Sequence, residues 1–187
     1  MSADLSDPYA DRQLVDEATQ RSVLLCQMAL RKPNTPTSTR VACLARLVML
    51  LDALPSIRAL DHRSRQIARA GNRRAKTLPD SDCSLQMSPR VAQLLFDRCT
   101  AYCDLAQANR RLGDVRAAAA NYHRADSLIE ALLSSALPAS GHEQVRAAAV
   151  ARQTQALGEW AEVEHAIGRP TSARRLEARA AGGRSDS

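Results

Sequence analysis

Apolar positions along this chain recur every three or four residues, and polar stretches that contain proline or glycine interrupt them. Runs that alternate apolar with polar residues, as half-buried strands require, are sparse. The pattern therefore predicts an all-α protein of about seven helices. The expected helices cover roughly residues 11–31, 39–53, 56–75, 88–112 and 114–135, a sixth segment that ends near 168, and a short seventh from 170.

The polar stretches also predict how the chain is divided. Residues 11–181 are expected to form one helical domain between disordered tails at 1–10 and 182–187. A hinge is expected at 77–87, because a polar linker that contains Pro79 precedes Ser88-Pro89, and this dipeptide is typical of a helix start.

The composition of the chain supports helices and also bears on its cellular compartment. Alanine, leucine and arginine dominate, and aromatic residues make up only 3% of the chain, so we expect an aliphatic core rich in small residues. No apolar run approaches the ~20 residues of a membrane span, and the acidic N-terminal residues do not fit a presequence. The five cysteines show no metal-ligand spacing. We therefore expect a cytoplasmic protein with reduced thiols and with neither a metal nor a cofactor.

One stretch has a spacing more specific than that of a helical hairpin in general. A large and a small residue precede a leucine-glycine-acid turn, and small, aromatic and small residues follow it. These positions are Leu105 and Ala106, then Leu112, Gly113 and Asp114, then Ala118, Tyr122 and Ala125. The stretch resembles the tetratricopeptide repeat, a hairpin of two antiparallel helices. An ordinary hairpin explains each residue separately, but it does not explain all of them in register.

Physical chemistry accounts for the same spacing. Gly113 permits a tight reversal without a Cβ clash. The three alanines let the two helices approach closely, and Tyr122 is expected to fill the space between neighbouring hairpins.

A weaker copy of the pattern lies downstream. Trp160 and Ala161 take the large and small places, Gly168 takes the turn, and Ala173 and Ala180 take the small places of the second helix. Two glutamates, Glu164 and Glu177, stand where bulky residues belong. We therefore expect a terminal hairpin with a polar outer face, as the end of a helical repeat requires.

A third, degenerate hairpin is expected around the turn Leu54-Pro55-Ser56. The spacing of the three turns exceeds the family period of about 34 residues, so longer helices or linkers are expected here. The resemblance implies stacked hairpins, an α-solenoid. A compact helical bundle is the alternative.

The resemblance also implies a function. In such solenoids the first helices of the hairpins line a concave groove, which here would hold a peptide or a helix of a partner protein. The residues expected to face this groove are Thr100, Cys103, Gln107, Arg110, Gln155, Glu162 and His165. The chain is therefore expected to be a non-enzymatic scaffold, adaptor or assembly factor.

A basic stripe on the third expected helix supports an alternative. At 100° per residue, six basic side chains fall on one side of this helix. They are Arg58, His62, Arg65, Arg69, Arg73 and Lys76. A stripe of one sign attracts acidic peptides or RNA, so a nucleic-acid-associated protein is the second function considered. No aromatic residue interrupts the stripe for base stacking, which weakens this alternative, and a solvated helix face also explains it.

Nothing in the sequence motivates an enzyme. There is no glycine-rich phosphate loop, and the four histidines lack the paired spacing of a metal site. Cys99 and Cys103 lie one helical turn apart without a histidine near them, which is typical of thiols that pack in a core.

Overall fold

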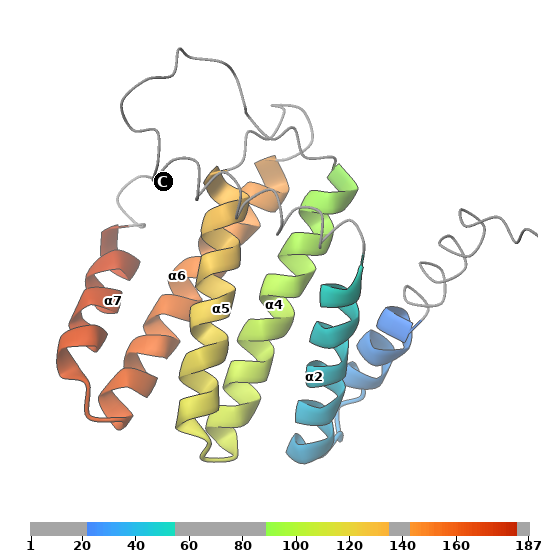
Figure 1. Cartoon of the computed structure of the whole chain (residues 1–187), viewed down its shortest axis with the longest axis horizontal. Coiled ribbons are helices and arrows are strands. Elements are labelled where there is room, and N and C mark those ends of the chain that lie inside the picture. The colour runs from blue at the N-terminus through green and yellow to red at the C-terminus, as the bar shows by residue number, and fades with distance from the viewer. Residues whose placement is uncertain (1–21, 55–88, 135–142, 183–187) are drawn as a thin grey trace, which may run out of the picture.

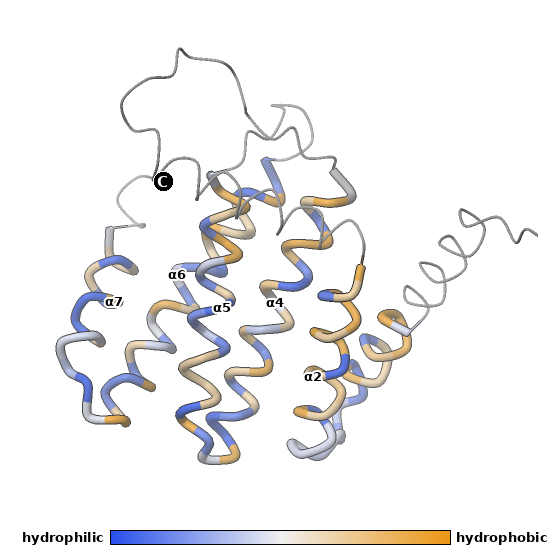
Figure 2. Tube along the Cα trace, in the orientation of Figure 1, coloured by the Kyte–Doolittle hydropathy of each residue, from blue (hydrophilic) through white to orange (hydrophobic). Residues whose placement is uncertain are grey.

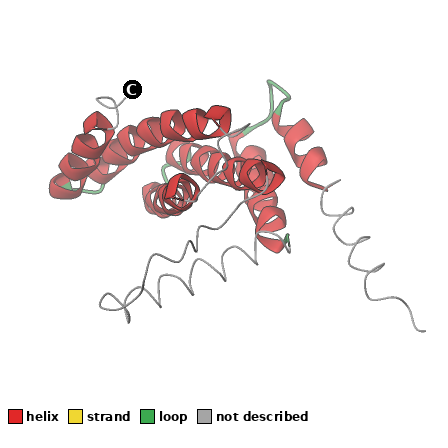
Figure 3. Ribbon diagram, turned by 90° about the horizontal axis from the view of Figure 1, so that it is seen from above, coloured by secondary structure: helices red, strands yellow, loops and turns green. Residues whose placement is uncertain are grey.

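The computed structural model of this chain describes residues 22–54, 89–134 and 143–182, and every regular element in these ranges is a helix (Figures 1 and 3). The elements are a helical segment at 22–30, α2 (Thr37–Ala53), α4 (Pro89–Arg111), α5 (Val115–Ser134), α6 (Glu143–Ala166) and α7 (Pro170–Gly182). The predicted all-α class is confirmed. The helix expected at 56–75, the hinge at 77–87 and both tails, apart from Gly182 at the end of α7, lie outside the described residues.

The long helices lie side by side in chain order, as Figure 1 shows. Helix α2 packs on α4, α4 on α5, α5 on α6, and α6 on α7. Helix α4 also contacts α6, so the first helices of two successive hairpins touch each other.

Two glycine turns close the hairpins α4–α5 and α6–α7 in the same way. Gly113 has a φ of 83° and Gly168 a φ of 80°, in the left-handed region that favours glycine. At the end of α4, the Asp114 amide donates to the Asn109 carbonyl and the Gly113 amide to the Arg110 carbonyl, both at 3.0 Å. The equivalent bonds at the end of α6 join Arg169 to Glu164 at 2.8 Å and Gly168 to His165 at 3.0 Å. Both are Schellman motifs, and the predicted glycine turns are confirmed.

Alanine at Gly113 is expected to lower the free energy of unfolding by about 1 kcal/mol, because an L-residue is strained at this φ. Gly158 is the matched control, since it lies inside α6 and no heavy atom lies within 4 Å of an added Cβ. Gly158→Ala is expected to raise the free energy of unfolding by about 0.5–1 kcal/mol. Urea denaturation measures both variants. The same sign of effect at the two sites would contradict a conformational role for Gly113.

Alanine fills the places where the helices of each hairpin approach. In the first hairpin Ala106, Ala118 and Ala125 are fully buried. In the second hairpin the buried alanines at the corresponding places are Ala161, Ala173 and Ala180. Each set stands at the same distances from its glycine turn, so the spacing read from the sequence is also a spacing of buried contacts.

The helical segment 22–30 leads into α2 through a turn at 31–36. The Thr35 hydroxyl donates to the Lys32 carbonyl at 3.0 Å and stabilises this turn. Cys26 lies near Cys43 of α2, and burial together with this second thiol raises the pKa of Cys26. In the described residues α2 therefore packs with the segment before it. The hairpin expected at Leu54-Pro55-Ser56 extends beyond them.

Helices α2 and α7 differ in polarity. Figure 2 shows that α2 is hydrophobic along most of its length, whereas α7 is largely hydrophilic. The exposed side chains of α7 include Arg174, Arg175 and Glu177. The polar outer face expected of the last hairpin is therefore observed on α7, where Glu177 is exposed, but Glu164 does not belong to it, because its side chain is buried.

Candidate functional site

Four of the side chains expected to face a groove gather between α4 and α6. Gln107 and Arg110 come from α4, and Gln155 and Glu162 come from α6. They lie around Glu159, which the sequence did not single out. A cavity of about 520 Å³ opens here, lined by Gln107, Arg110, Arg111, Glu159 and Glu162. We call this cavity the α4–α6 groove.

The Glu159 carboxylate organises the floor of the groove. Gln107 Nε2 donates to its two oxygens at 2.8 and 2.9 Å, and the Tyr122 hydroxyl and Gln155 Nε2 each donate at 2.8 Å. Burial by itself would raise the pKa of Glu159, but these hydrogen bonds outweigh burial and hold the pKa below its usual value. The floor is therefore a charged group fixed by donors from three helices.

The rim of the groove is held more loosely than its floor. Arg110 Nη1 lies 2.6 Å from Glu162 Oε2, but the two side chains are 43% and 62% exposed. An exposed ion pair of this kind contributes about 0–1 kcal/mol, so a partner can replace it with contacts of its own. Arg111, also exposed, adds a second guanidinium beside the pair.

The other three residues expected in the groove do not line it. Cys103 is fully buried, and this burial raises the pKa of its thiol to about 11. The prediction for Cys103 is therefore wrong, because its side of α4 is covered by packing. Thr100 is half-buried, and its Oγ1 has no hydrogen-bond partner among the described residues. His165 reaches α7 instead, where its Nε2 lies 3.1 Å from Glu177 Oε1.

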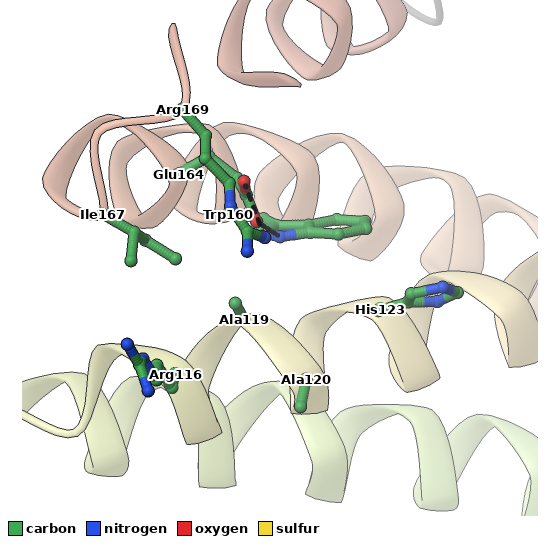
Figure 4. Close-up of a pocket in the computed structure, with 8 residues that line it drawn as sticks. All are labelled: Arg116, Ala119, Ala120, His123, Trp160, Glu164, Ile167 and Arg169. Carbon is green, nitrogen blue, oxygen red and sulfur yellow. Dashed lines mark hydrogen bonds and ion pairs between the residues drawn. The ribbon is translucent and has the colours of Figure 1, made fainter. Parts of the chain in front are cut away.

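A second hollow, of about 500 Å³, lies between α5 and α6 near the turn into α7 (Figure 4). We call it the Trp160 pocket. Its lining residues are Arg116, Ala119, Ala120 and His123 from α5, Trp160 and Glu164 from α6, and Ile167 and Arg169 from the turn. At 100° per residue, Trp160 and Glu164 fall on a different side of α6 from Glu159 and Glu162. The two hollows are therefore separate sites on one helix.

Glu164 is the chemically unusual member of the Trp160 pocket. Its side chain is only 5% exposed. Oε1 accepts a hydrogen bond from Trp160 Nε1 at 3.0 Å, and the Trp160 ring stacks on His123 with centroids 5.6 Å apart. Oε2 has no hydrogen-bond partner among the described residues, and it lies 3.9 Å from Arg169 Nη1, an ionic contact beyond hydrogen-bond distance. The pocket thus contains a buried carboxylate of which only one oxygen is hydrogen-bonded.

Neither Glu159 nor Glu164 was predicted as a site residue from the sequence. Glu159 shares a helical face with Gln155, but this spacing does not reveal that Gln107 and Tyr122 reach it from two other helices. For Glu164 a signal was present. A charged residue where the expected repeat pattern places a bulky one needs polar surroundings, and this departure from the pattern marks the pocket.

Several other expectations bear on the candidate sites. The basic stripe from Arg58 to Lys76 lies outside the described residues and stays a prediction. Cys99, like Cys103, is buried as expected of a packing thiol. Within 22–54, 89–134 and 143–182, no group of three or more His, Cys, Asp or Glu side chains is placed to hold a metal ion. In the same ranges, no helix combines the length and the apolar character that crossing a membrane requires.

Comparisons with known proteins gave no match to this chain among family models, curated proteins or solved structures. Function is therefore inferred from the residues and their geometry.

Proposed function

We propose that this chain is a protein-interaction module, a scaffold or adaptor that binds a peptide or a helix of a partner protein in the α4–α6 groove and catalyses no reaction. The observation that carries the proposal is the convergence of Gln107, Arg110, Gln155 and Glu162 around Glu159. The repeat resemblance also implies a partner-binding role for the first four of these residues.

The proposal includes stacked hairpins of the tetratricopeptide kind rather than a compact bundle. Three observations support this arrangement. The two complete hairpins end in the same pair of turn bonds, they carry buried alanines at the same distances from the turn, and their first helices α4 and α6 touch. Hairpins related by a constant displacement leave their first helices on one side, where a continuous groove forms.

The chemistry of the groove favours a polar partner segment of mixed charge. Arg110 and Arg111 offer guanidinium groups to acidic side chains, and Glu162 offers a carboxylate to basic ones. A partner that opens the exposed Arg110–Glu162 pair loses about 0–1 kcal/mol. Each charge-assisted hydrogen bond that it gains in return contributes about 1.5–3 kcal/mol.

Charge reversal at Arg110 is expected to weaken partner binding about tenfold or more, because it removes the pairing with Glu162 and repels acidic groups of the partner. Affinity purification of the full chain identifies the partner, and titration with the purified partner measures the Kd. Arg174→Glu is the matched control, since Arg174 lies exposed on α7 and the change in net charge is the same. This control is expected to bind normally.

A photo-crosslinking residue in place of Arg111 tests the location directly. It should link to the partner, whereas the same residue in place of Arg174 should not. Nuclease treatment should leave recovery of the partner unchanged, and loss of recovery would instead favour the nucleic-acid alternative. Normal binding by Arg110→Glu, together with no crosslink from position 111, would count against the groove.

A further inference from the structure

The Trp160 pocket brings three kinds of chemistry within one small hollow. Glu164 supplies a buried acid, Arg116 and Arg169 supply two guanidinium groups, and Trp160 with Ile167 supplies an apolar wall. The proposed partner groove on the other side of α6 uses none of these residues. The pocket therefore calls for a separate explanation.

The buried acid sets the first requirement on a ligand. Glu164 Oε2 is buried beneath the surface of the pocket and has no hydrogen-bond donor among the described residues, while Oε1 is held by Trp160. A ligand reaches Oε2 only when the exposed Arg169 side chain, which lies 3.9 Å from it, turns aside. Figure 4 shows the carboxylate directed between the indole ring and the Arg169 side chain. A buried oxygen without a donor is unfavourable, so a ligand that donates an N–H here gains more than it would at an exposed acid.

The two arginines set the second requirement. Arg116 stands at the start of α5 and Arg169 in the turn between α6 and α7, so they approach the pocket from different walls (Figure 4). Both are exposed, and Arg169 is 67% exposed despite its contact with Glu164. Neither guanidinium is locked in place by that contact, and both can turn toward an anion in the pocket.

The distance between the charges sets the third requirement. Glu164 Oε2 and Arg169 Nη1 lie 3.9 Å apart, too far for a hydrogen bond, so a ligand with an ammonium and a carboxylate close together can replace this one ionic contact with two hydrogen-bonded ones. The ammonium and carboxylate of an α-amino acid are attached to the same carbon and have this arrangement. The remaining wall, which includes Ala119, Ala120 and Ile167, is apolar and has room for a side chain.

We propose that the Trp160 pocket binds a free α-amino acid with an apolar side chain. Its ammonium donates to Glu164 Oε2, its carboxylate pairs with Arg116 and Arg169, and its side chain packs on Trp160 and Ile167. A simple anion leaves the acid without a donor, and a simple cation faces two arginines. A chain terminus of a polypeptide has one of the two charges but not both.

Isothermal titration of the full chain with L-leucine and L-phenylalanine tests the proposal. Saturable binding is expected with a Kd below about 1 mM. L-Leucinamide, which lacks the carboxylate, and N-acetyl-L-leucine, which lacks the ammonium, are each expected to bind at least about tenfold more weakly. Absence of binding by both free amino acids would overturn the proposal, and so would equal binding of either blocked compound.

Variants place the ligand in this pocket. Glu164→Gln and Arg169→Gln are each expected to weaken binding of L-leucine about tenfold, whereas Arg174→Gln is expected to bind as the unmodified chain does. Arg169 is exposed, so its variant keeps the fold and remains informative even if Glu164→Gln proves unstable; circular dichroism checks both. Unchanged binding by folded Arg169→Gln would place the amino acid elsewhere and overturn the assignment. The α4–α6 groove shares none of these residues, so the Arg110 and Arg111 variants test partner binding there independently.

Discussion

Tyr122→Ala is expected to lower the free energy of unfolding by about 3–5 kcal/mol, the range for removing a buried aromatic side chain. Tyr122 is fully buried, and its ring packs where α5 contacts the adjoining helices. Its hydroxyl donates to Glu159 of the next hairpin at 2.8 Å. The substitution therefore removes both packing and a bond that joins successive hairpins. Urea denaturation followed by circular dichroism measures the change.

Tyr122→Phe separates the two contributions. It keeps the ring and removes only the hydroxyl, so a loss of about 0.5–1.5 kcal/mol is expected. Glu159 keeps its donors Gln107 and Gln155 in this variant. An alanine variant that is no less stable than the phenylalanine variant would show that the ring does not fill the space between hairpins.

Asp52→Ala is expected to lower the free energy of unfolding by about 1.5–3 kcal/mol, the range for hydrogen bonds to charged groups. Asp52 near the end of α2 accepts bonds from Arg98 Nε and from the Tyr102 hydroxyl of α4, the second at 3.2 Å. The Arg98 side chain is only 9% exposed, so loss of this carboxylate leaves a guanidinium with less compensation in a buried setting. Denaturation with guanidinium chloride measures the effect.

Asp97→Ala is the matched control for Asp52→Ala. Asp97 accepts its bond from Gln93 on the same helix at 2.9 Å, and a pair at this spacing contributes about 0.2–0.5 kcal/mol. Burial also raises the pKa of Asp97, so the fold disfavours its charged form. Equal losses for the two variants would show that the link between α2 and α4 adds nothing beyond a local helix contact.

Features that depend on neighbours in the sequence were predictable. Gly113 and Gly168 carry positive φ values because a tight turn at the end of a helix needs a residue without a Cβ. This requirement can be recognised from the sequence alone. The helix ends follow from the same local signals. The alanines at fixed distances from each turn also gave the buried contact positions of both hairpins.

Features that depend on a third helix were not predictable. Cys103 has the spacing of a groove residue, yet its burial depends on how closely α6 approaches α4, which no local pattern states. His165 was assigned to the groove from its place on α6, but its ring contacts Glu177 of α7 instead. Glu159 acquires its role from donors on three helices, and two of these helices are distant in the sequence.

The two identical glycine turns have a consequence for where this chain can change in length. Both turns lie along one edge of the row of helices, and the helix ends that bound 55–88 and 135–142 lie along the opposite edge (Figure 1). Helix α2 packs on α4 across the long interval, as α5 packs on α6 across the short one. An insertion between α4 and α5 or between α6 and α7 would break a Schellman bond, so the turns at Gly113 and Gly168 hold the length of each hairpin fixed.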